Sequence, residues 1–163
     1  MEETAPVRIE NKSIGFVDIA QFENGGAYRG GCLVTDLKTY PQEFRITNPV
    51  RPTNLQSILY GSTLDEYIYI ELICIPLIRA IKSTMSLIIV QRPVLLEIRP
   101  KIQTPMIHIG DGEIKLHPDF LNESTNAKRL LSNTNRSKLI EPFSRIQTAL
   151  AEAHSQKIGE PTE

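Results

Sequence analysis

The chain has 163 residues, of which 40% are apolar and 23% charged. This composition is typical of a folded domain and argues against a disordered, fibrous or membrane-spanning protein. The 18 basic and 19 acidic residues leave a net charge of −1, so no global field attracts nucleic acid or anionic lipid. The first residues show no apolar signal-peptide region, and Cys32 and Cys74 stand apart in apolar stretches. We therefore expect two buried thiols in a cytoplasmic protein.

The first half of the chain reads as three strands. Residues 13–19 (SIGFVDI) are apolar on both faces apart from Asp18, as in a strand covered on both sides. Four glycines then fall within residues 25–31 and predict a turn. Residues 28–36 and 42–47 are strand-like segments joined by a short loop, and they predict a hairpin with one solvated face.

A helical region follows the hairpin. Thr53 is placed to cap a short helix, NLQSILY, that stops at Gly61. Apolar residues at helical spacing from Leu64 onward predict a second helix, which Pro76 should kink or restart.

The next segments predict a return to the sheet. Residues 86–90 (SLIIV) form the uninterrupted apolar run of a central buried strand. A short helix, VLLEIR, should follow Pro93, and residues 105–110 should add another strand. From Pro118 the pattern is polar and helical, with an apolar stripe on the last helix.

The domain organisation follows from these elements. We expect a mobile lead at residues 1–12, an α/β domain at 13–117, C-terminal helices docked on it at 118–155, and a disordered tail at 156–163. The fold class is α/β: a three-stranded antiparallel meander followed by helix, strand, helix and strand, with a C-terminal helical tail.

This element order resembles the ribonuclease H-like fold. The resemblance implies a nuclease that holds two Mg²⁺ or Mn²⁺ ions with carboxylates on the first strand, on the first main helix and at the end of the fourth strand. Asp18 matches the first position and Glu71 the second, both as metal ligands and as catalytic residues. The third position holds Gln91 and Arg92, and a positive side chain there opposes a metal. Asp36 or Glu97 would replace the missing acid only if the strands lay differently.

Two other groups of polar residues are candidate binding sites. A proline-stiffened loop could recognise a carboxylate, a phosphate or a partner backbone, although capping and solvation also explain its residues; they are Arg45, Asn48, Arg51, Thr53 and Gln56. The C-terminal region is locally basic and could contact nucleic acid, although its pattern resembles a solvated helix face more than a groove for a single strand; its residues are Lys128, Arg129, Arg136, Lys138 and Arg145. The three histidines lack the spacing of a zinc site.

The sequence therefore favours a non-catalytic binding or assembly module that acts as a subunit of an intracellular complex, with a protein partner or a second copy, no cofactor and no membrane contact. One alternative is a metal-dependent nuclease centred on Asp18, with Mg²⁺ or Mn²⁺ as its cofactor. Another is a small-ligand or nucleotide sensor that uses a pocket on the sheet.

Overall fold

The computed structural model describes residues 12–111 and 113–161, and most of the predicted mobile lead lies outside these residues. Six strands form one sheet in the order β3-β2-β1-β4-β5-β6. Strands β1 (Ser13–Phe22), β2 (Ala27–Asp36) and β3 (Pro41–Ile46) form the antiparallel meander. Strands β4 (Leu87–Val90) and β5 (Met106–Ile109) extend it in parallel, and β6 (Ile114–Lys115) pairs antiparallel with β5. This arrangement confirms the ribonuclease H-like α/β fold.

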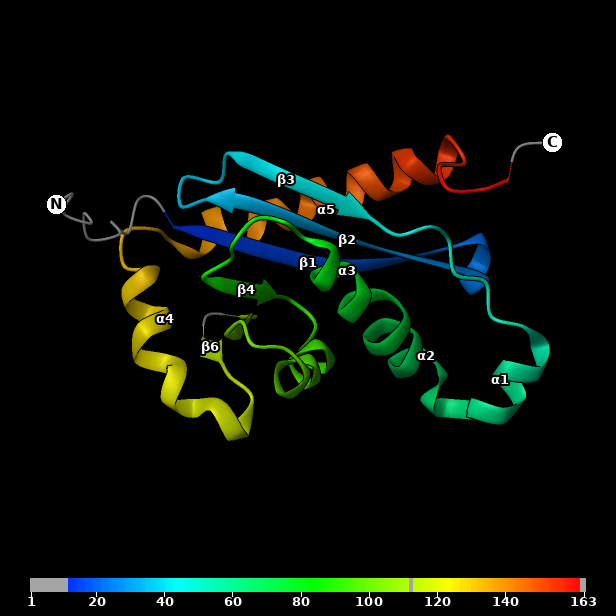
Figure 1. Ribbon diagram of the computed structural model, residues 1–163, viewed down its shortest axis with the longest axis horizontal. Helices are drawn as coiled ribbons and strands as arrows, with labels where there is room; N and C mark the ends of the chain where they lie inside the picture. The colour runs from blue at the N-terminus through cyan, green and yellow to red at the C-terminus, as the bar shows by residue number, and fades with distance from the viewer. Residues whose placement is uncertain (1–11, 112, 162–163) are drawn as a thin grey trace, which may run out of the picture.

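Helices cover both faces of the sheet. On one face, α2 (Leu64–Tyr67), the π-helical segment η4 (Ile68–Cys74) and α3 (Ile75–Ala80) run on from one another, and the 3-10 segment η5 (Pro93–Lys101) packs beside them. On the other face lie α4 (Ser124–Leu130) and the long helix α5 (Arg136–Ser155). The 3-10 segment η6 (Pro118–Glu123) precedes α4 and contacts η5, where Arg99 pairs with Glu123 and lies over the ring of Phe120. Figure 1 shows α5 running along β1 and β2. Among the described residues no helix is both long and apolar enough to span a bilayer.

Alternation along β1 divides the core into two layers. Val17 and Ile19 pack against the α2–α3 side, whereas Ile14 and Phe16 pack against α5. The predicted central strand, β4, is buried along its whole length because it is covered on both faces. The side chain at position 18 follows the alternation and points toward α5, which decides what a carboxylate there can contact.

The helical region changes its winding just before Pro76, where the π-helical segment ends at Cys74 and α3 begins at Ile75. Proline has no backbone N–H, so the α-helical hydrogen bond expected from that position cannot form. The preceding segment η4 adopts the wider π-helical turn, a conformation that occurs often at functional sites. Its residues Ile70 and Glu71 line a surface cavity described below.

A buried arginine anchors the end of α5. Arg29 is completely buried and donates hydrogen bonds to His154 Nδ1 and to the carbonyl of Ile158, both at 2.8 Å. His154 also stacks on Phe22, with ring centroids 4.2 Å apart. Ile158 belongs to the segment 156–163 that the sequence predicts to be disordered, and its carbonyl supplies one of the acceptors that a buried guanidinium needs.

Helix α1 (Asn54–Tyr60) begins with the predicted cap. Thr53 Oγ1 accepts from the N–H of Gln56 at 3.1 Å, and Gln56 Oε1 accepts from the N–H of Thr53 at 2.8 Å. The helix ends at Gly61, whose φ of +53° favours glycine. No residue of α1 is buried, and Figure 1 shows the helix lying apart from the strands.

Candidate functional site

The predicted catalytic aspartate is buried and fully hydrogen-bonded. Asp18 lies in β1 and is 5% exposed. Its Oδ1 accepts from Nε of Arg92 at 3.0 Å, and its Oδ2 accepts from Nε2 of Gln147 at 2.8 Å. A buried carboxylate is tolerated when both oxygens have donors and a positive charge stands nearby, and this site meets both conditions.

Arg92 and Gln147 reach the aspartate from different parts of the fold. Arg92 follows β4, and Gln147 comes from the middle of α5. Both also donate to the carbonyl of Ile19, at 3.0 and 2.9 Å. Arg92 and Gln147 therefore connect β1 to the end of β4 and to α5. Arg92 also places a positive guanidinium beside the carboxylate, at the position where a bound metal ion would need further negatively charged oxygen ligands.

The second predicted metal ligand lies elsewhere. Glu71 belongs to η4 on the other side of the sheet from α5, and its carboxylate pairs with Lys101. Of the suggested substitutes, Asp36 accepts from the N–H groups of Lys38 and Tyr40 at 2.8 and 3.0 Å. Glu97 lies in η5 and lines the same surface cavity as Glu71. Over residues 12–111 and 113–161, no group of three His, Cys, Asp or Glu side chains could hold a metal ion. The donor set present does not fit a two-metal centre.

The polar loop predicted to bind a ligand is engaged mainly within the chain. Arg45 pairs with Glu43, and Arg51 pairs with Glu23 and Glu160. Hydrogen bonds from the N–H of Lys82, from Ser83 and from Arg45 lower the pKa of Glu43 to about 2. Hydrogen bonds from Arg51 and His154 likewise lower the pKa of Glu23 to about 2.

The remaining three residues of that loop have local roles. Thr53 and Gln56 form the cap of α1. Asn48 packs against Gly159 so closely that a Cβ on the glycine would fall 2.1 Å from Asn48 Oδ1. These contacts account for the polar character of the loop without a ligand.

The basic residues of the C-terminal region are spread over several elements. Arg136 donates to the carbonyl of Gly110 at 2.7 Å, and Arg145 pairs with Glu141 in α5. Lys128 and Lys138 are exposed. Nucleic-acid contact through this region remains a prediction.

A surface that sequence reasoning did not single out lies on α1. Leu55, Ile58 and Leu59 are 64%, 76% and 70% exposed, although their spacing is that of a helix face normally buried. The sequence carries no signal for this exposure, because apolar residues at helical spacing are found both on buried faces and on faces that bind a partner.

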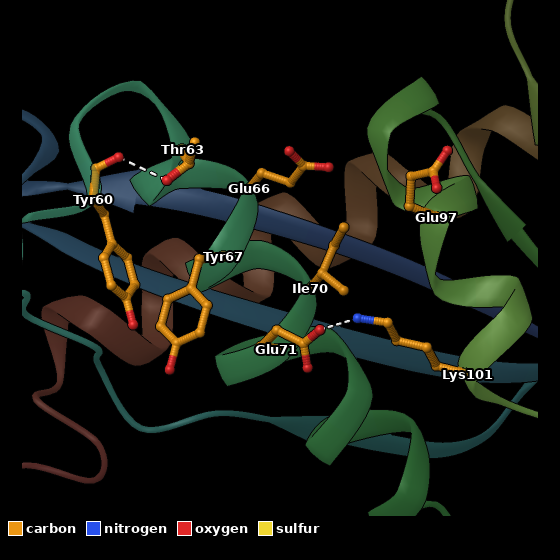
Figure 2. Close-up of a pocket in the computed structure, with 8 residues that line it drawn as sticks. All are labelled: Tyr60, Thr63, Glu66, Tyr67, Ile70, Glu71, Glu97 and Lys101. Carbon is orange, nitrogen blue, oxygen red and sulfur yellow. Dashed lines mark hydrogen bonds and ion pairs between the residues drawn. The ribbon is translucent and has the colours of Figure 1, made fainter.

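An acidic cavity of about 420 Å³ adjoins α1 (Figure 2). Tyr60, the last residue of α1, contributes to its wall and packs edge-on against Tyr67, with ring centroids 4.5 Å apart. Glu66 from α2 and Glu97 from η5 stand on either side of Ile70 in Figure 2. Glu71 and Lys101 complete the wall as an ion pair.

No family model matches the chain, and no curated protein sequence matches it. Among solved structures, it is similar to the Endonuclease V of Bacillus subtilis, with 14% identity and a TM-score of 0.42 over 64% of this chain and 47% of that one. It is also similar to Ciona intestinalis Endonuclease V in complex with DNA containing an inosine followed by a ribo-adenosine, with 13% identity and a TM-score of 0.42 over 85% of this chain and 56% of that one. The chain spans about half the length of these structures.

Proposed function

We propose that this chain is a non-catalytic binding module on a ribonuclease H-like scaffold, and that it works as a subunit of a larger complex by holding a segment of another protein on α1. The observation that carries the proposal is the exposure of Leu55, Ile58 and Leu59 on a helix that buries none of its own residues. Burying one such side chain stabilises a complex by roughly 1.5–3 kcal/mol before the costs of association. Clustered apolar side chains on a surface are typical of an interaction site.

The charge around α1 indicates what kind of segment binds there. Residues 52–78 contain Asp65, Glu66 and Glu71 but no lysine or arginine. An acidic or nucleic-acid partner would be repelled, whereas a segment with aliphatic and basic side chains is complementary. The capping box supports α1 without tertiary packing, so the partner meets a helix that is already formed.

The state of Asp18 supports the non-catalytic part of the proposal. Asp18 is the only charged residue of the predicted first strand, and its carboxylate accepts hydrogen bonds from Arg92 and Gln147. These contacts give Asp18 a structural role, because they connect β1 to the end of β4 and to α5.

The two cysteines, Cys32 and Cys74, are free and buried, which supports the further proposal that the protein works in the reducing cytoplasm.

Capture from a native extract with matched variants tests the binding proposal. The bait pair is the wild type and a Leu55→Gln/Ile58→Gln variant, because glutamine keeps the helical propensity of α1. The control, Tyr40→Gln/Leu121→Gln, removes two comparably exposed apolar side chains elsewhere, 68% and 61% exposed. A partner retained by the wild type and the control but lost by the α1 variant supports the proposal; capture that is absent, or equal for all three, refutes it.

A metal-dependent nuclease is the second candidate, since Asp18 occupies the first-strand position that the fold resemblance assigns to a metal ligand. Its test is incubation of the pure protein with Mg²⁺ or Mn²⁺ and with labelled DNA and RNA, including a duplex that contains inosine. Cleavage that disappears in Asp18→Asn would establish the nuclease and overturn the non-catalytic proposal. Because that substitution also removes the clamp, the variant must first show a native circular dichroism spectrum.

A further inference from the structure

We infer that the free edge of β3 is an interface between two copies of this chain, which pair through β3 in antiparallel orientation about a two-fold axis. This inference goes beyond the proposed function and concerns a different surface. Strand β3 is the last strand of the sheet, and Figure 1 shows it as the outermost one. None of its six residues is buried, whereas every residue of β2 except Asp36 is buried.

The backbone of β3 presents hydrogen-bonding groups at this edge. The N–H of Thr47, directly after β3, donates to the carbonyl of Gly30 in β2 at 2.9 Å. Residue pairs of an antiparallel ladder alternate between hydrogen-bonded and non-hydrogen-bonded positions, and the pairing with β2 is regular over residues 43–46. Arg45 therefore directs its N–H and C=O toward β2. Phe44 directs both groups outward, where a further strand can pair with them.

This part of the edge lacks the features that prevent strand pairing in many proteins. Lysine, proline and bulges at an edge strand oppose the addition of another strand. Strand β3 has a proline and a shift of register near its start, but residues 43–46 contain neither lysine nor proline. Phe44 is 40% exposed. A hollow of about 430 Å³ beside the edge is lined by residues 44–47 and by three residues of α3, Pro76, Leu77 and Ala80. A strand paired with β3 would cover Phe44 and this hollow.

The charges of β3 favour a second copy as the partner. Directly opposite side chains lie on the same face of a sheet, so symmetric pairing of two copies places one residue opposite itself. If Glu43 or Arg45 stood on the axis, two like charges would face each other, which is destabilising. With Phe44 on the axis, Glu43 of each copy lies opposite Arg45 of the other. The strand is therefore complementary to itself about Phe44.

Glu43 and Arg45 are positioned for this contact. The N–H groups of Lys82 and Ser83 donate to the Glu43 carboxylate at 3.0 and 2.8 Å and hold it in place. Arg45 donates to Glu43 of its own strand through Nε at 2.6 Å, and its two Nη atoms make no hydrogen bond with residues 12–111 or 113–161. Opposite residues at such non-hydrogen-bonded positions have Cα atoms about 4.5 Å apart. The Nη atoms can therefore donate to Glu43 of the second copy, as a charge-assisted hydrogen bond.

Disulfide capture tests the pairing and its register. On the axis, the Phe44 Cα atoms of the two copies would lie about 5.5 Å apart, within the roughly 4.4–6.8 Å that a disulfide spans. Phe44→Cys should therefore form a covalent dimer with oxidised glutathione. Tyr40→Cys is the control for random collision, because this residue is 68% exposed but lies four positions from the axis. The wild type should stay uncrosslinked, since Cys32 and Cys74 are buried.

Sedimentation equilibrium measures the association without a cross-link. We expect the wild type to reach twice the monomer mass at high micromolar concentration. Phe44→Lys places two ammonium groups opposite each other and keeps an aliphatic stem beside Gly31, on which the Phe44 ring packs. It should raise the dissociation constant at least about tenfold, because like charges opposed across an interface disfavour association. Leu121→Lys, at a position that is 61% exposed on η6, adds the same charge elsewhere and should dimerise like the wild type.

A monomeric wild type, undiminished dimerisation of Phe44→Lys, or equal cross-linking of Phe44→Cys and Tyr40→Cys would overturn the inference. Each variant must show a native circular dichroism spectrum, and if Phe44→Lys does not, the cross-linking result decides. A dimer that Leu55→Gln/Ile58→Gln abolishes and Phe44→Lys does not would place the second copy on α1 and overturn the β3 interface. A monomer that still captures a partner through α1 refutes this inference and leaves the proposed function intact.

Discussion

Replacing Arg92 by alanine should destabilise the fold by about 2 kcal/mol. The substitution removes the hydrogen bonds from the guanidinium to Asp18 and to the carbonyl of Ile19, and it leaves a carboxylate that is 5% exposed with one donor, Gln147. Breaking a fully buried pair costs roughly 3–5 kcal/mol, whereas an exposed pair is worth about 0–1 kcal/mol. The Arg92 side chain is 43% exposed, so solvent screening places the cost between these limits.

Urea unfolding followed by far-ultraviolet circular dichroism measures this cost. For a chain of this size a loss of about 2 kcal/mol lowers the melting temperature by roughly 4–8 °C. The control is Arg79→Ala, an exposed arginine for which we expect a change within about 0.5 kcal/mol.

A double-mutant cycle with Asp18→Asn isolates the interaction between the two side chains. We expect a coupling energy of about 1.5–2 kcal/mol. Hydrogen bonds to charged groups contribute roughly 1.5–3 kcal/mol, and the partial exposure of the Arg92 side chain places this pair at the low end of that range. If Arg92→Ala unfolds like the wild type and the coupling is zero within error, the description of Asp18 as a clamped structural carboxylate is refuted.

Three more predictions follow from other contacts. Glu23 and Glu43, whose pKa values in the folded protein are lowered to about 2 from 4.5, contribute stability that is present above pH 4.5 and lost as the pH falls toward 2; urea midpoints across this range should fall less in Glu43→Gln than in the wild type, and equal losses would contradict the assignment. Gly30→Ala should cost about 1–3 kcal/mol in thermal unfolding, because its Cβ would lie 2.2 Å from Ile73 Cγ2, and an unchanged melting temperature would show that the helix yields freely. Burial raises the pKa of the Cys32 thiol to about 12, so at pH 8 a thiol reagent should react with it only after urea is added; prompt reaction of the native protein at this cysteine would refute its burial.

The strands were predictable because their signals are local. The alternation in SIGFVDI and the apolar run SLIIV each indicated a strand, and β1 and β4 contain them. The cap of α1 was equally local, since Thr53 and Gln56 are three residues apart. Arg92 was recognised as a positive charge opposed to metal binding, and the structure shows which carboxylate it pairs with.

The partners of the candidate site residues were harder to predict. Gln147 contacts a residue 129 positions earlier in the chain, and its only local signal is a polar side chain set between the buried Phe143 and Leu150 on α5. The exposure of α1 was also out of reach, because helical apolar spacing describes a face that is either buried in the chain or left for a partner.

The contact between Asp18 and Gln147 also bears on how the chain matures on the ribosome. At roughly 5–20 residues per second, the 129 residues that separate the two positions take about 6–26 s to synthesise. Throughout that interval the α5 side of the nascent sheet stays open and Asp18 Oδ2 must be hydrated. Helix α5 replaces this water and covers the apolar layer when it docks, so the final form of the sheet is reached only after α5 has been synthesised.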